Sequence, residues 1–132
     1  MALVRRSIPP SIHVPEEVDL TGQVNAEIAS GIYVGGTGGQ GDFVRGAMMA
    51  ARGHSIIALP STARDGAVSR IVPVLKDVPI TTPRSDADIV VTEFGAAELR
   101  GQPIDERIRR MVAISHPNFR DTLQREARAL HD

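Results

Sequence analysis

The chain has 132 residues, of which 42% are apolar and 23% charged; these values fit one globular domain and exclude a disordered chain. Fifteen basic against sixteen acidic residues leave a net charge of −1, which excludes the positive surface of a protein that binds nucleic acid or an anionic membrane. The absence of cysteine excludes disulfides, thiolate nucleophiles and cysteine-ligated zinc. No apolar run approaches the roughly 20 residues of a spanning helix, and nothing indicates export, so we expect a cytoplasmic location.

The N-terminal part is divided by proline and glycine. Residues 1–16 are rich in proline and are predicted to form an extended tail. Residues 17–27 contain two short apolar pieces on either side of Gly22, which suits a tight turn, so a hairpin is predicted there. Residues 31–34 are a short strand candidate that leads into a glycine-rich segment.

This glycine loop has five glycines in seven residues, Gly35-Gly36-Thr37-Gly38-Gly39-Gln40-Gly41, and Asp42 then begins a predicted helix over 43–51. Its spacing matches the dinucleotide fingerprint, and its backbone N–H groups at a helix start would attract an anion. A Rossmann site also needs an acidic residue at the end of the next strand, and that strand ends Ala58-Leu59-Pro60-Ser61. We interpret the loop as a contact for a phosphate-bearing or thioester ligand; a structural turn and NAD binding are the alternatives.

Four further strands are predicted, over 54–59, 68–75, 80–82 and 88–92. Pro60 ends the first, and an exposed loop over 61–66 follows it. Pro73 inside the second indicates an edge strand or a bulge. The last is an apolar run typical of a central strand, and it ends at Glu93.

Two helices are predicted at the end of the chain. The first, 103–114, has one apolar face and an arginine-rich face that is expected to lie mostly outside. The apolar face consists of Ile104, Ile108, Met111 and Val112, and the other face carries Arg107, Arg109 and Arg110. The second, 117–131, begins with proline at a favourable position and aligns Phe119, Leu123, Ala127 and Leu130. Strands followed by helices indicate an α/β or α+β domain.

Few side chains outside the glycine loop suggest chemistry. Glu93 ends a strand, where open α/β sheets place ligand groups, but a carboxylate capping the following helix is an equal alternative. Arg64 can clamp a phosphate or can be a solvated turn residue. The histidines show no metal-ligand spacing, and His116 before Pro117 is interpreted as a helix-start residue; the four are His13, His54, His116 and His131.

Several stretches, taken in order from about residue 17 to about 126, resemble the acetyl-CoA hydrolase/transferase family, which includes 4-hydroxybutyrate and acetate CoA-transferases. The stretches are Glu17 to Asn25, the loop Gly36 to Phe43 with Val44-Arg45-Gly46-Ala47, Ile71-Val72-Pro73, Asp86 to Gly95, Leu99-Arg100-Gly101 and His116-Pro117. The resemblance implies a NagB/RpiA/CoA transferase-like α/β fold, a mixed sheet with flanking helices. It makes residues 17–132 part of the C-terminal domain and leaves 1–16 as the tail.

The family resemblance also implies roles for individual residues. A glutamate attacks the acyl-CoA, CoA forms a thioester on its carboxylate, and an acceptor carboxylic acid then takes the CoA. The glycine loop would hold coenzyme A through Gly36, Gly38, Gly39 and Gln40. Arg64 stands where relatives have a lysine that touches CoA, and Glu93 matches a glutamate beside the active site.

The resemblance includes neither the N-terminal domain of the family nor a match to its nucleophilic glutamate, and Glu17 aligns with a strand residue instead. We therefore expect no transferase turnover from this chain alone, whether it is a remnant, a truncated form or one piece of a split enzyme whose missing domain is a separate chain. Uncovered sheet edges would favour a homo-oligomer. The alternative is a stand-alone module that binds CoA or a nucleotide through the glycine loop.

Overall fold

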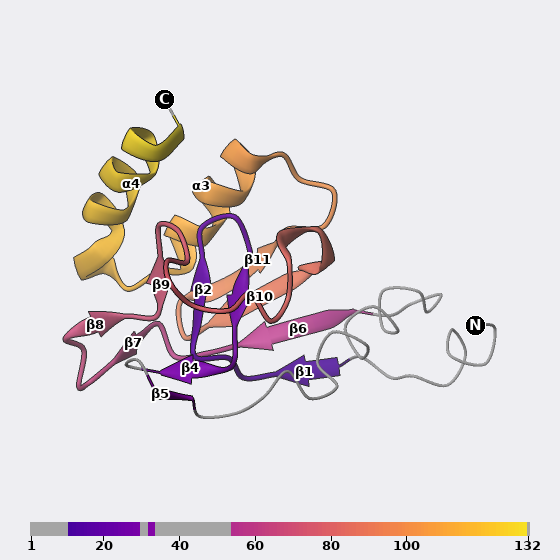
Figure 1. Cartoon of the computed structure of the whole chain (residues 1–132). Coiled ribbons are helices and arrows are strands. Elements are labelled where there is room, and N and C mark those ends of the chain that lie inside the picture. The colour runs from indigo at the N-terminus through magenta and orange to yellow at the C-terminus, as the bar shows by residue number, and fades with distance from the viewer. Residues whose placement is uncertain (1–10, 30–31, 34–53, 132) are drawn as a thin grey trace, which may run out of the picture.

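The computed structural model describes residues 11–29, 32–33 and 54–131 (Figure 1). The largest sheet in this part of the chain has four strands. The strands lie in the order β1-β6-β10-β11. Their bounds are β1 Ser11–His13, β6 Ser55–Ala58, β10 Ile89–Thr92 and β11 Gly95–Glu98. The first three run parallel and β11 is antiparallel to β10. The strand predicted to be central, β10, is therefore internal to the sheet, and the mixed α/β architecture is confirmed.

A second, three-stranded sheet has the order β3-β2-β9 and contains the predicted hairpin. β2 (Glu17–Asp19) turns at Gly22 into β3 (Val24–Asn25), and β9 (Ile71–Val72) pairs with β2 in parallel. The Asp19 carboxylate organises the turn, because its Oδ1 accepts hydrogen bonds from the Thr21 N–H at 2.9 Å and the Gln23 N–H at 3.0 Å. Two small hairpins complete the strands: β4 (Ile28–Ala29) with β5 (Ile32–Tyr33), and β7 (Thr62–Ala63) with β8 (Val68–Ser69).

The two long helices, α3 (Ile104–Ile114) and α4 (Pro117–His131), lie together on one side of the molecule (Figure 1). A short 3-10 helix, η1 (Arg84–Asp86), precedes β10. Both predicted helices are confirmed to within a residue at each end. In the described part of the chain, no helix is long and apolar enough to span a bilayer.

The core lies between the four-stranded sheet, the smaller sheet and the helices. Residues in register on neighbouring strands share a face, so Ile57, Val90 and Ala97 point the same way, and all three are buried. Met111 and Ile114 of α3 belong to the same buried cluster. Val18, Leu20, Val24 and Ile71 of the smaller sheet complete a continuous core.

Several details differ from the sequence predictions. β1 forms within the predicted tail and β11 was not predicted. The segment expected to be an exposed loop, 61–66, begins with the fully buried Ser61 and enters the β7–β8 hairpin. The single strand expected over 68–75 is two strands, because the chain bends at Arg70, whose N–H donates to the Ser61 carbonyl at 2.8 Å. The predicted helix over 43–51 lies outside the described residues.

The helix faces need two corrections. Arg107 was expected to lie mostly outside, but it is only 7% exposed and donates hydrogen bonds to backbone carbonyls of three other residues. Leu130 was placed on the apolar face of α4, but it is 51% exposed, while Leu123 and Ala127 are buried as predicted. A helical pattern assigns every arginine to the solvent-facing side, because the pattern contains no information on backbone carbonyls that distant segments bring to the helix.

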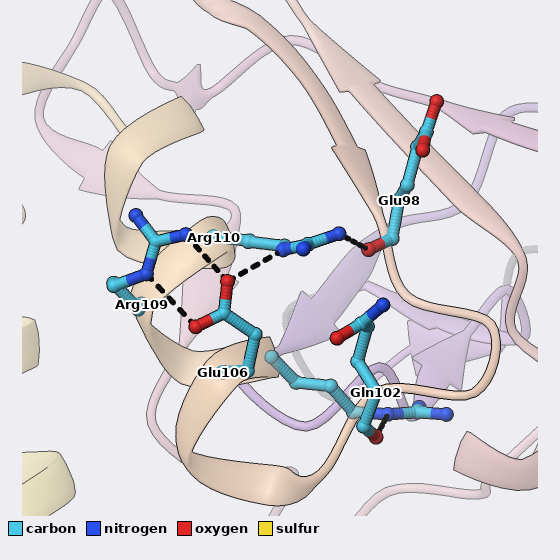
Figure 2. A network of polar contacts seen from close by, with 6 residues as sticks. Glu98, Gln102, Glu106, Arg109 and Arg110 are labelled. Atoms are coloured by element: carbon cyan, nitrogen blue, oxygen red, sulfur yellow. Dashed lines mark hydrogen bonds and ion pairs between the residues drawn. The ribbon is translucent and has the colours of Figure 1, made fainter.

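An ion-pair network on α3 ties this helix to the edge strand β11 (Figure 2). The Glu106 carboxylate accepts hydrogen bonds from Arg109 Nε at 2.9 Å and Arg110 Nε at 2.8 Å. Arg110 Nη1 also donates to the Glu98 backbone carbonyl at 2.7 Å. The register of β10 and β11 directs that carbonyl away from β10, so Arg110 covers part of the free edge of β11.

The same network predicts a weak loss of stability in acid. Hydrogen bonds from Arg109 and then Arg110 lower the pKa of Glu106 to about 2 from its usual 4.5. A lowered folded-state pKa gives stability that is present above the unfolded value and is lost as the pH falls from 4.5 toward 2. Glu106→Gln should remove this part of the pH dependence, with a small effect because the pair is exposed. Urea unfolding at pH 5 and pH 3 measures the change in the free energy of unfolding between the two pH values. Glu126→Gln on α4 is the control, and its free energy of unfolding should change between pH 5 and pH 3 as much as that of the wild type.

Candidate functional site

The candidate site is built on the carboxyl ends of the parallel strands β6 and β10. These ends meet at the same edge of the sheet because the strands are neighbours and run the same way. Glu93 directly follows β10, and Ser61 lies three residues after β6. The Ser61 N–H donates to Glu93 Oε1 at 2.8 Å, so residues 32 positions apart form one polar contact at this edge.

Glu93 lies in a tight turn rather than at the start of a helix. Thr92 pairs with Gly95, so Glu93 and Phe94 are the two loop residues that join β10 to β11. Thr92 Oγ1 donates to the Ile114 carbonyl at 2.5 Å and accepts a hydrogen bond from the Phe94 N–H at 3.1 Å. The turn is therefore attached to the end of α3, and the alternative of a helix-capping carboxylate is wrong.

The surroundings of Glu93 favour its ionised form. Burial, the largest single contribution, opposes ionisation, but the hydrogen bond from the Ser61 backbone N–H, the nearby Ser61 hydroxyl, the backbone N–H of Glu93 itself and the charge of His116 outweigh it. Together they hold the pKa of the Glu93 carboxyl below its usual value. At neutral pH this side chain is an anion with a fixed backbone donor on one oxygen, which suits it to accept a hydrogen bond rather than to act as an acid.

Arg64 lies on the segment that leaves Ser61. It follows β7 and opens the turn of the β7–β8 hairpin, where Arg64, Asp65 and Gly66 have φ of 51°, 54° and 89°. The Ala67 N–H closes this turn on the Arg64 carbonyl at 3.1 Å. Three consecutive left-handed residues expose the side chain of Arg64 at the surface of the hairpin.

Arg64 also lines a cavity of about 470 Å³ between the β2, β4 and β7–β8 segments. Apolar side chains of Ile28, Val68 and Val78 form part of its wall. The second arginine in the wall, Arg70, is held by Glu16, because Arg70 Nη1 donates to the Glu16 carbonyl at 3.1 Å and lies 3.6 Å from its carboxylate. Arg64 and Arg70 both line this cavity, so a ligand in it would meet positive charge on that wall.

The structure brings Glu93 and the Arg64 segment to one edge through Ser61. The predicted contacts Gly36, Gly38, Gly39 and Gln40 lie outside the described residues. Sequence reasoning missed Ser61, whose contribution depends on the strand pairing, and it assigned His116 only a helix-start role. Among the described residues, no group of three or more acidic or histidine side chains is arranged to hold a metal ion.

Comparison with known proteins identifies the family. Residues 3–127 match the model of the acetyl-CoA hydrolase/transferase C-terminal domain. The chain belongs to this family, and the predicted fold class and family are confirmed.

Individual proteins to which this chain is similar agree with this assignment. A 4-hydroxybutyrate coenzyme A transferase of Clostridium kluyveri is 46% identical over 117 residues, which is 88% of this chain and 27% of that protein. The crystal structure of RipA from Yersinia pestis is similar with a TM-score of 0.82 at 47% identity, over 92% of this chain and 26% of that one. The crystal structure of a 4-hydroxybutyrate CoA-transferase from Porphyromonas gingivalis is similar with a TM-score of 0.73 at 42% identity, over 91% of this chain and 26% of that one. The chain thus spans about a quarter of the length of the relatives it matches.

Proposed function

We propose that this chain provides the coenzyme A-holding side of a site at which CoA is transferred between an acyl-CoA and a small carboxylic acid, or at which the acyl-CoA is hydrolysed. The observation that carries the proposal is the position of Glu93. An ionised carboxylate stands at the carboxyl edge of an internal parallel strand, is fixed there by Ser61 in the segment that follows the neighbouring strand, and lies beside the residues that lead to Arg64.

Each residue has a stated part in this proposal. Arg64 pairs with a phosphate of CoA, for which a guanidinium offers several donors. The glycine loop, with Gly36, Gly38, Gly39 and Gln40, lets its backbone approach the ligand closely. Glu93 faces the reacting end and accepts a hydrogen bond there without taking part as the nucleophile.

The nucleophile of the family reaction is a different glutamate, which we propose is supplied by another part of the assembly. Glu16 and Glu17 are poor substitutes in the structure. Glu17 begins β2 and its Oε1 accepts a hydrogen bond from Asn25 Nδ2 at 3.2 Å, while Glu16 is paired with Arg70. The purified chain should therefore show no transfer of CoA from acetyl-CoA to butyrate; turnover that depends on a glutamate of this chain would contradict this.

Calorimetric titration with CoA tests the binding proposal. Arg64→Ala should weaken binding by about 10- to 100-fold, the value of a charge-assisted hydrogen bond of about 1.5–3 kcal/mol. Gly39→Val should also weaken binding, because a branched side chain would prevent close backbone approach. Arg128→Ala, an exposed arginine of α4, is the matched control and should leave affinity unchanged.

Two outcomes would contradict this assignment. No heat of binding up to millimolar CoA would mean that these residues do not form a site in this chain. Binding of ATP as tightly as CoA, with the same sensitivity to both variants, would favour the stand-alone nucleotide-binding module instead.

A further inference from the structure

The turn that carries Glu93 is contacted on its other side by the junction between α3 and α4. The ring of Phe94, the residue after Glu93, meets the His116 ring edge-on with centroids 5.4 Å apart. The His116 ring also meets Phe119 at 6.2 Å. The imidazole is therefore placed between an aromatic ring of the turn and one of α4, an arrangement that restricts its rotation.

Hydrogen bonds also fix the orientation of His116. Its Nδ1 accepts a hydrogen bond from the Asn118 N–H at 3.1 Å, and its carbonyl accepts one from the Phe119 N–H at 2.9 Å, so His116 caps the start of α4. With Nδ1 as an acceptor, the neutral ring carries its proton on Nε2. The capping interaction therefore decides which nitrogen holds the single proton.

The other cation near this turn is already engaged. Arg120 Nε donates to the Ser115 carbonyl at 2.9 Å, and its guanidinium lies over the Phe94 ring, 5.5 Å from the centroid. On the opposite side, the segment after β6 presents the uncharged Ser61 to Glu93. Among the described elements packed against the turn, His116 is the titratable group whose charge acts on Glu93.

We propose that His116 is a positioning residue, which holds the Glu93 carboxylate in place through its contact with Phe94 and through its own charge. In the neutral state the helix cap fixes the ring and the ring supports Phe94. In the protonated state Nδ1 is a donor and no longer accepts the Asn118 N–H, and the positive charge of the imidazolium then attracts the carboxylate. This gives His116 a role beyond starting α4. The inference rests on the proposed role of Glu93, but its test needs no coenzyme A, so the two can fail separately.

The test is an NMR titration of the Glu93 side-chain carboxyl in the whole chain. In His116→Ala and His116→Gln the midpoint should rise toward the usual glutamate value, because the attracting charge is gone. His54→Gln is the control: His54 pairs with Asp88 at 3.2 Å, at the amino ends of β6 and β10, and its loss should leave the Glu93 midpoint unchanged.

A second variant keeps the proposal testable if the His116 variants unfold. Phe94→Leu removes the aromatic ring that contacts His116, so the Glu93 midpoint should rise in this variant as well. A purely structural role for His116 would lower the melting temperature of its variants and leave the Glu93 midpoint unchanged. An unchanged Glu93 midpoint in folded His116 variants, or in Phe94→Leu where the His116 variants do not fold, would overturn the proposal.

Discussion

Replacing Arg107 with methionine should destabilise the domain by about 2–4 kcal/mol, the largest single loss expected from any arginine of α3. Arg107 is buried, and among the described residues its side-chain donors reach backbone carbonyls alone: Nε to Gln102 at 3.0 Å, and Nη1 to Thr21 at 2.9 Å and Arg84 at 2.7 Å. These carbonyls belong to the β2–β3 turn, the 3-10 helix and the segment before α3. One side chain thus connects three parts of the fold.

The physical reason for the loss is unsatisfied hydrogen bonding. Methionine retains the length and apolar contacts of the side chain but leaves carbonyls without donors, and the Thr21 bond is buried. Burial first, and then the charge of Arg84, lowers the pKa of the Arg107 guanidinium, which indicates that this cation is held by carbonyl dipoles against an unfavourable environment. The pairing is therefore costly to break even though no carboxylate provides it.

Urea unfolding of three variants measures this effect. Arg107→Lys should lose less than Arg107→Met, since an ammonium retains the charge and some donors. Arg109→Met, two residues along the same helix but with a side chain that is 69% exposed, should change the unfolding free energy by less than about 1 kcal/mol. Equal losses in Arg107→Met and Arg109→Met would show that the three carbonyl contacts contribute little.

Turn-forming residues and short apolar runs in the sequence correctly predict the elements that they border. Gly22 marks the β2–β3 turn, the apolar runs before Pro60 and Glu93 mark β6 and β10, and Pro117 marks the start of α4. β11 is not predicted because Gly95-Ala96-Ala97-Glu98 has a weak intrinsic preference for a strand. The segment forms a strand because it pairs with β10, a tertiary contact that the local sequence does not show.

The candidate site shows the same limit at the level of single residues. Glu93 could be singled out because it ends an apolar strand, and this needs only local reading. Its partners Ser61 and His116 lie 32 residues before it and 23 after it, and they reach it only through a parallel strand pair and the packing of the α3–α4 junction. The hydrophobic pattern of a single sequence does not show such contacts between distant segments.

Gly22→Ala should be the most damaging glycine replacement among the described residues, with a loss of about 3 kcal/mol. Gly22 has φ of +98°, and a Cβ built on it would lie 3.0 Å from Leu99 Cδ1, 3.1 Å from Ala87 Cβ and 3.2 Å from Arg107 Nη1. The first two atoms belong to fully buried or nearly buried side chains, so they have little room to move. The free-energy costs of backbone strain and of side-chain crowding therefore add in Gly22→Ala.

Gly66→Ala separates the two causes, because Gly66 has φ of +89° but nothing lies within 4 Å of its added Cβ. It should lose about 1 kcal/mol from backbone strain alone, and an equal loss in Gly22→Ala would contradict the crowding argument. The double variant Gly22→Ala with Arg107→Met should lose less than the sum of the single variants, because methionine removes the Nη1 atom that the new methyl group meets. Strict additivity would instead mean that the turn moves away from Arg107 as soon as Gly22 is replaced.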